Sequence, residues 1–126
     1  MLIDTSVLLW AALHPNRLSG RAADLLNDTD SIRYLSPLST FEISQKAARG
    51  KLELPLPAAQ FVNEAVRQLE LEWLPLTHDH LAAVDRIPWI HRDPFDRMLA
   101  LQAFVEDIPI VSPDPQFDAM GVQRIW

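Results

Sequence analysis

Four acidic residues, far apart in the chain, stand at positions where a sheet of parallel strands and its helices would gather them. Asp4 directly follows the first apolar run, and Asp114 comes shortly after a late apolar run. Glu42 and Asp96 lie in the first two turns of predicted helices. Because the carboxyl ends of parallel strands and the N-termini of the following helices share one edge, we expect these four carboxylates to converge there.

Converging carboxylates repel one another unless a cation or a proton lies between them. Hard divalent cations such as Mg²⁺ and Mn²⁺ prefer carboxylate oxygen and water, and they keep coordination positions open for phosphate. Ions of this kind acidify a bound water and stabilise the departing oxygen in phosphoryl transfer. The residue types therefore predict a metal-dependent site for phosphodiester hydrolysis that needs no nucleophilic side chain.

Each of these acids also has a local explanation. Asp4 can cap the helix that follows it, and Asp114, between two prolines, is a typical turn residue. Asp96 suits the positive end of a helix dipole, and Glu42 can pair with Lys46 on a solvated helix face. Only the joint placement of the four acids favours a metal site over these local roles.

Short apolar runs alternate with longer amphipathic segments along the chain. The expected strands are 1–3, 32–35, 73–76, 108–111 and 122–126, and the expected helices are 7–13, 20–27, 37–50, 58–71, 78–87 and 94–106. Ser19, Ser36, Thr77 and Asp93 stand at N-cap positions of these helices. No hairpin dipeptide joins neighbouring strand runs, so we expect βα units in one domain over residues 1–126. The predicted fold is α/β, with three α/β/α layers and a central, mainly parallel sheet of four to five strands.

The composition limits the classes of protein to which the chain can belong. Of its 126 residues, 48% are hydrophobic and 22% are charged, as in a globular domain. Cysteine is absent, which excludes disulfides and thiolate metal sites, and no apolar run is long enough to span a bilayer. Eleven basic residues against seventeen acidic ones give a net charge of −6, which argues against nucleic acid held mainly by counterion release. We expect a cytoplasmic protein whose four tryptophans fill the core or an interface.

Four segments, taken in order along the chain, carry a family resemblance. They are the opening Leu-Ile-Asp-Thr-Ser-Val-Leu-Leu-Trp (2–10), the Phe41-Glu42-Ile43 step with Lys46 and Gly50-Lys51-Leu52, the His-Arg-Asp-Pro-Phe-Asp-Arg run (91–97), and the Ile-Val-Ser-Pro-Asp-Pro-Gln-Phe run (110–117). Together they resemble the PIN-domain family and, more narrowly, the VapC-type toxins of bacterial toxin–antitoxin pairs.

This resemblance implies an endoribonuclease whose Mg²⁺ or Mn²⁺ is held by the acids Asp4, Glu42, Asp96 and Asp114. It also implies neighbours of that site, which are hydroxyls that orient the acids or water (Thr5, Ser6 and Ser112), cations that contact the RNA backbone (Lys46, Arg92 and Arg97), and Asp93. Helix capping explains Ser6 and turn bonding explains Ser112 at least as well, and surface solubility explains the cations equally well. N-capping explains Asp93 better than a role as a metal ligand does.

The resemblance further implies three partners: an RNA substrate, a cognate antitoxin that covers the acidic cleft, and a second copy of the chain in a homodimer. The apolar helix 58–71 and the acids at the exposed edge of the sheet motivate this hypothesis of protein partners. No membrane partner is expected. The alternative function is a catalytically silent RNA-binding module of the same PIN-like fold.

Overall fold

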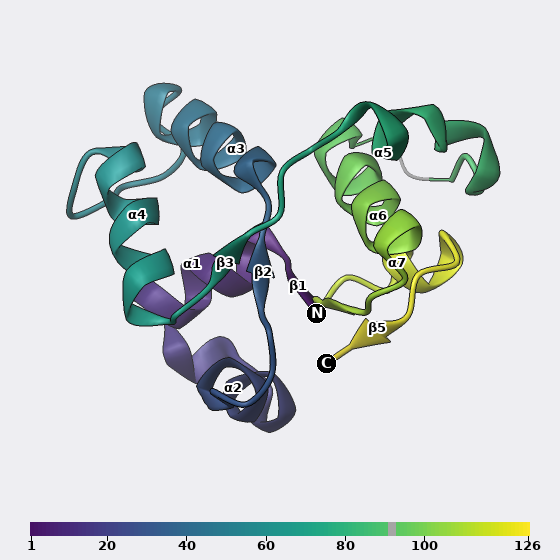
Figure 1. The fold of residues 1–126 in the computed structure, drawn as a ribbon. Coiled ribbons are helices and arrows are strands. Elements are labelled where there is room, and N and C mark those ends of the chain that lie inside the picture. The colour runs from purple at the N-terminus through teal and green to yellow at the C-terminus, as the bar shows by residue number, and fades with distance from the viewer. Residues whose placement is uncertain (91–92) are drawn as a thin grey trace.

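The computed structural model describes residues 1–90 and 93–126. Within these residues, five short strands form one sheet in which every neighbouring pair is parallel. Their spatial order is β3-β2-β1-β4-β5, so β1 lies in the middle (Figure 1). The strands are β1 (Leu2–Ile3), β2 (Tyr34–Leu35), β3 (Glu72–Trp73), β4 (Ile110–Val111) and β5 (Arg124–Ile125).

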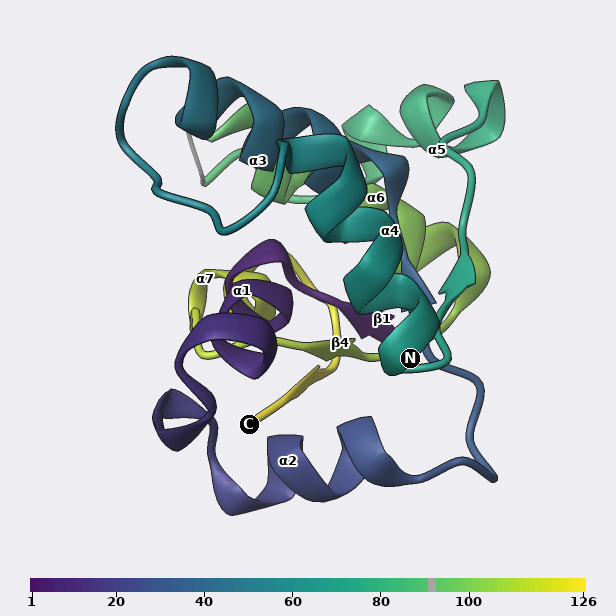
Figure 2. The ribbon, with the colours of Figure 1, turned by 90° about the vertical axis from the view of Figure 1, so that its left-hand side faces the viewer.

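Helices cover both faces of the sheet, as two views at right angles show (Figures 1 and 2). In Figure 1, α1, α2 and α4 lie on one side of the sheet, and α5, α6 and α7 lie on the other. None of the described helices has the length and apolar character that a membrane crossing requires. The helices are α1 (Thr5–Leu13), α2 (Gly20–Asn27), α3 (Pro37–Ala48), α4 (Ala58–Gln68), α5 (His78–Ala82), α6 (Pro94–Glu106) and α7 (Gln116–Ala119), with the 3₁₀ turns η1 (Pro15–Arg17) and η2 (Val84–Arg86).

Alternate residues of the strands enter two hydrophobic cores. Leu2 and Ile110 pack with residues of α6 and α7, whereas Ile3 and Val111 pack with residues of α1, α2 and α4. All four side chains are fully buried. Successive side chains of a strand point to opposite faces, so strands covered on both sides, such as β1 and β4, need apolar residues at both positions. The predicted three-layer α/β fold with a parallel sheet is confirmed.

Several element boundaries differ from the prediction. The predicted helix 78–87 divides into α5 and η2, because Ala83 and Arg86 donate backbone hydrogen bonds to carbonyls only three residues back, as in a 3₁₀ turn. The predicted helix 58–71 ends at Gln68, shortly before Glu70 adopts a positive φ of 53°. The single turns η1 and α7 were not predicted, since they are too short to show a hydrophobic period.

The predicted helix caps are confirmed. Ser19, Ser36 and Asp93 each accept a hydrogen bond from a backbone N–H of the first helical turn, over 3.0, 3.1 and 2.9 Å respectively. At the other end of α3, Gly50 has a φ of +70°, the left-handed conformation in which glycine is favoured after a helix. These local signals fix where α2, α3 and α6 begin, and therefore which residues face the strand ends.

The apolar residues of α4 pack inside the protein. Phe61, Val62 and Ala65 are at most 5% exposed, and they belong to the core that also contains Ile3. The apolar residues of this segment, which motivated the hypothesis of protein partners, therefore pack against the chain's own core. Its hydrophobic pattern is explained by contacts within the chain.

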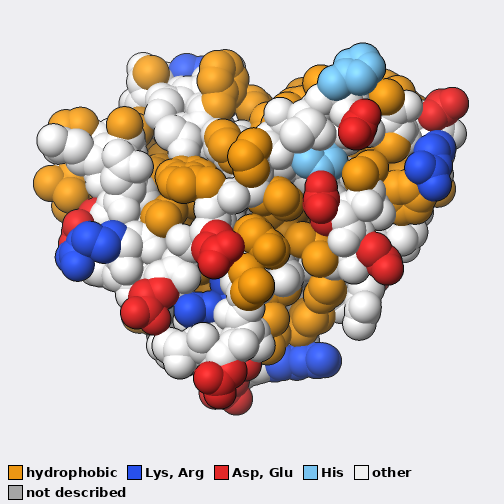
Figure 3. Space-filling view, viewed as in Figure 1, with side chains coloured by type: hydrophobic (Ala, Val, Ile, Leu, Met, Phe, Trp, Pro, Cys, Tyr) orange, Lys and Arg blue, Asp and Glu red, His pale blue; other side chains and the backbone are white. Residues whose placement is uncertain are grey.

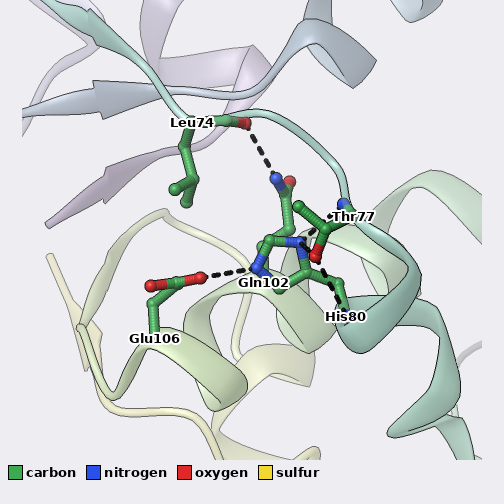
Figure 4. A network of polar contacts seen from close by, with 5 residues as sticks. All are labelled: Leu74, Thr77, His80, Gln102 and Glu106. Atoms are coloured by element: carbon green, nitrogen blue, oxygen red, sulfur yellow. Dashed lines mark hydrogen bonds and ion pairs between the residues drawn. The ribbon is translucent and has the colours of Figure 1, made fainter.

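A polar network ties the segment after β3 to helix α6 (Figure 4). The backbone N–H of Thr77 donates to His80 Nδ1 at 2.9 Å, so the neutral imidazole carries its proton on Nε2 and directs it to Glu106 Oε1 at 2.7 Å. The side-chain amide of Gln102 donates to the carbonyl of the residue after β3 at 2.9 Å. Since His80 and Gln102 are buried, these bonds anchor the helix whose first turn carries Asp96.

Candidate active site

Strand ends and helix N-termini surround a pocket of about 350 Å³. The Asp4 N–H donates to the Val111 carbonyl at 3.1 Å, which places the start of α1 beside the segment that leads from β4 to Asp114. The four carboxylates expected to converge all line this pocket, together with Lys46 and residues of α1. Its lining residues are Asp4, Ser6, Leu9, Trp10, Glu42, Lys46, Asp93, Asp96 and Asp114.

Asp4 is held by hydroxyl groups. It is 6% exposed, and its Oδ2 accepts hydrogen bonds from Ser6 Oγ at 2.9 Å and from Ser112 Oγ at 2.7 Å. Although Asp4 occupies the N-cap position of α1, its side chain makes no capping bond there. Burial raises the pKa of Asp4, the hydroxyl bonds of Ser112 and Ser6 oppose that change, and the nearby charge of Glu42 adds to it.

Glu42 is only 7% exposed, so the prediction of a solvated helix face is wrong at this position. Its Oε1 accepts from Lys46 Nζ at 3.1 Å, the expected pairing across one helical turn. Its Oε2 is buried and receives no hydrogen bond from any described group. A buried carboxylate oxygen without a donor is costly, and a cation in the pocket would satisfy it.

The acids at the starts of α6 and α7 combine a local role with a place in the pocket. Asp93 caps α6, as predicted, and Asp114 Oδ1 accepts from the backbone N–H of Gln116 at 2.9 Å, as the turn explanation requires. Asp96 lies in the first turn of α6. All three line the pocket as well, so the local explanations and the shared site hold together.

The predicted neighbours of the acids occupy different places. Ser112 Oγ, besides donating to Asp4, accepts from the Asp114 N–H at 3.1 Å, so it links two of the acids. Thr5 is outside the pocket lining, and its hydroxyl lies 2.8 Å from that of Ser39, where it ties α1 to α3. Arg92 and His91 lie outside the described residues.

Arg97 packs against Trp89. Its guanidinium carbon lies 3.3 Å from the ring centroid of Trp89, and the side chain is not part of the pocket lining. Trp89 itself is 74% exposed, so the expectation that every tryptophan fills the core or an interface finds no support in this position. Its ring shields the guanidinium of Arg97 from solvent on one side.

Two residues that line the pocket, Leu9 and Trp10, were not predicted from the sequence. They follow Ser6 by three and four residues, so all three lie on one face of α1. This spacing could have predicted both residues, because the second turn of a helix that begins at the acidic edge lies along the same wall of the pocket. The pocket therefore extends from the carboxylates to an aromatic side chain.

The residue types of the pocket fit a hard divalent cation, since they supply oxygen donors and one of these, Glu42 Oε2, is buried without a donor. Among the described residues, however, no three acidic or imidazole side chains stand close enough to form a ready metal cage. Carboxylates without a cation between them repel one another, and Glu42 is paired with Lys46. A cation would have to draw the carboxylates inward.

A family model described as the PIN domain matches residues 1–123. The chain belongs to the PIN domain family. A comparison with curated proteins finds no significant match.

Solved structures with the same PIN fold are similar over nearly the whole chain. A chain of VapBC2 from Rickettsia felis, in a crystal structure bound to a DNA fragment from their promoter, has a TM-score of 0.74 and 10% identity, over 98% of this chain and 96% of that one. FitAcB from Neisseria gonorrhoeae has a TM-score of 0.69 and 22% identity, over 99% of this chain and 96% of that one. DNA-bound VapBC from Salmonella typhimurium has a TM-score of 0.70 and 15% identity, over 98% of this chain and 95% of that one. At these identities the likeness establishes the fold.

Proposed function

We propose that this PIN-domain chain is a metal-dependent endoribonuclease and the toxin of a toxin–antitoxin pair. The observation that carries the proposal is that Asp4, Glu42, Asp96 and Asp114 line one pocket although they are distributed over the whole chain. No fold requirement places four acids together, and each lies at the strand or helix end where a ligand of an α/β sheet would bind.

The residues in and around the pocket would have different roles in this reaction. The four acids would hold Mg²⁺ or Mn²⁺, which, when bound, supplies an acidified water and stabilises the departing oxygen. Ser6 and Ser112 fix the orientation of Asp4 through their hydroxyl bonds. Thr5 sets the spacing of α1 and α3. Lys46, whose side chain is 48% exposed beside the acids, would bind a phosphate oxygen of the RNA.

A net charge of −6 is compatible with an RNA substrate if the acids are covered by divalent cations. The backbone would then be bound through the metal and through Lys46. Arg92 stays a predicted RNA contact, since it lies outside the described residues. Arg97, covered by Trp89, is better placed to hold that tryptophan than to reach the substrate.

A ribonuclease that acts on the RNA of its own cell needs an inhibitor, and we infer a small antitoxin that covers the pocket and a homodimer of the chain. The similar structures include chains of VapBC and FitAcB, which supports the antitoxin partner. Apolar side chains are also available for protein partners. Figure 3 shows many of them on one face of the molecule, and Ile32, Phe41 and Trp73 are 55%, 60% and 40% exposed.

Cleavage of RNA with Mn²⁺, with and without chelator, tests the proposed activity. We expect cutting that requires the ion and is lost in Asp4→Asn and in Asp96→Asn, whereas Asp24→Asn, an exposed acid of α2, should cut normally. Undiminished cutting in both pocket variants would overturn the site assignment. RNA binding without any cutting would favour the catalytically silent module. Copurification with the product of the neighbouring reading frame tests the antitoxin.

A further inference from the structure

The pocket has a second end, which lies away from the carboxylates. Ser6, Leu9 and Trp10 form its wall along α1, and Trp10 is six residues beyond Asp4. At about 1.5 Å of rise per residue, this is roughly 9 Å along the helix axis. An RNA strand whose scissile phosphate lies at the acids and whose chain continues along this wall would pass Trp10.

The ring of Trp10 is held in place from two directions. Trp126 packs against it edge-on, with ring centroids 5.8 Å apart. Arg17 lies over it, with its guanidinium carbon 4.5 Å from the ring centroid. The backbone of η1 positions this arginine, because the Arg17 N–H donates to the His14 carbonyl at 2.9 Å.

Arg17 is an exposed cation with its hydrogen-bonding groups available. Within the described part of the chain it forms no ion pair, in contrast to Arg67 and Arg124, which bind Glu64 and Asp118. Stacking on an aromatic ring uses the face of a guanidinium and leaves its five N–H donors, which lie in the plane, free to bind. The ring also restricts the motion of the side chain, so less entropy is lost when a ligand binds.

We propose that Arg17, held on Trp10, is a phosphate-binding residue for the RNA strand that enters the pocket, a role that deepens the function proposed above. It binds a phosphodiester outside the scissile position, and Trp10 forms the apolar wall along which the nucleotide passes. A guanidinium suits this place because it can bind two phosphate oxygens at once. In a chain with an excess of acids, a cation held against the pocket residue Trp10 also guides the substrate toward the metal site.

Binding is measured in the unmodified chain with Ca²⁺, a hard cation that also prefers carboxylate oxygen, in place of Mg²⁺ or Mn²⁺, by the anisotropy of a short fluorescein-labelled single-stranded RNA. Arg17→Gln should weaken binding about fivefold to tenfold and lower the slope of log K against log salt by about 0.7, the value for one contact to a single strand. Arg17→Lys, which keeps the charge, should restore most of the slope. Arg67→Gln, a surface arginine of α4 paired with Glu64, is the matched control and should change neither quantity.

The active chain gives a second readout. Because the contact is made equally in the bound substrate and in the transition state, Arg17→Gln should raise KM about fivefold and change kcat less than twofold. Affinity and salt slope that are unchanged in Arg17→Gln would overturn this role and leave the proposed nuclease intact. If the chain binds no RNA, both proposals fall. RNA binding that depends on Arg17 in a chain that cuts no RNA would support the phosphate-binding role and overturn the catalytic one.

Discussion

Replacing Asp4 by asparagine should stabilise the metal-free protein and remove its response to divalent cations. Asp4 is 6% exposed, and burial together with the charge of Glu42 raises its pKa. A raised pKa means that the ionised carboxylate is less favourable in the folded state than in the unfolded state, so at neutral pH its charge costs stability. Asparagine removes that charge and keeps an oxygen that can accept from Ser6 and Ser112.

The size of the effect follows from two opposing contributions to the stability of the folded chain. Hydrogen bonds to a charged group contribute about 1.5–3 kcal/mol each, whereas burial of an ion costs several kcal/mol. The raised pKa of Asp4 indicates that the cost of burial exceeds the gain from the hydrogen bonds. We expect the free energy of unfolding to rise by about 1 kcal/mol in the asparagine variant. For 126 residues, with an unfolding entropy of about 0.26 kcal/mol/K, this is an increase in Tm of about 4 °C.

Thermal melts in EDTA and in Mn²⁺ separate the two halves of this prediction. At an ion concentration ten times the Kd, binding to the folded state adds about 1.4 kcal/mol, which raises the Tm of the unmodified chain by about 5 °C. Asp4→Asn should melt higher in EDTA and gain little from Mn²⁺, and Asp24→Asn should behave like the unmodified chain. A lower Tm of Asp4→Asn in EDTA, or an equal Mn²⁺ shift in both proteins, would refute the reasoning.

Three other variants have expected outcomes that follow from the same contacts. Ser112→Ala removes a fully buried hydroxyl that binds two acids, so the free energy of unfolding in urea should fall by about 2 kcal/mol, and an unchanged midpoint would contradict this. Lys46→Gln removes the cation that competes for Glu42, so calorimetry should detect Mn²⁺ binding about fivefold tighter; equal Kd values would show that there is no competition. The Nε and Nη2 atoms of Arg97 are buried without a described hydrogen-bond partner. Arg97→Met should therefore leave the free energy of unfolding in urea unchanged or raise it by up to about 1 kcal/mol. A fall of more than about 2 kcal/mol would mean that the stacking on Trp89 outweighs the cost of the buried charge.

The fold could be predicted from the sequence because both faces of the sheet are buried. Leu2 and Ile3 enter opposite cores, so no polar residue interrupts the strand, and this continuous apolar pattern is typical of parallel sheets. The strand ends were less predictable. Each strand pairs over only two residues, and pairing partners are set by neighbours far along the chain, such as Leu2 with Tyr34 and with Ile110.

The positions of the acids could also be predicted, because strand ends and helix starts lie at the same edge of a parallel sheet. This holds for any length or sequence of the connecting loops. Their surroundings could not. The burial of Glu42 depends on how α3 packs against its neighbours, and the direction of Arg97 depends on where Trp89 lies. Arg17 reaches the pocket wall only because η1 turns the chain back onto α1. These are contacts between elements, which local patterns do not specify.

The groups that hold Asp4 leave its charge available. An arginine or lysine beside a buried carboxylate would stabilise it by neutralising its field, and a cation would then gain little from binding there. Ser6 and Ser112 instead satisfy oxygen lone pairs with neutral hydroxyls, so the carboxylate stays oriented and these groups do not neutralise its charge. Among residues 1–90 and 93–126, Lys46 bonds only Glu42, and its long side chain is 48% exposed and can move aside. The metal-free pocket therefore keeps an electrostatic cost that a divalent cation would remove, and this cost is the source of the affinity that we expect.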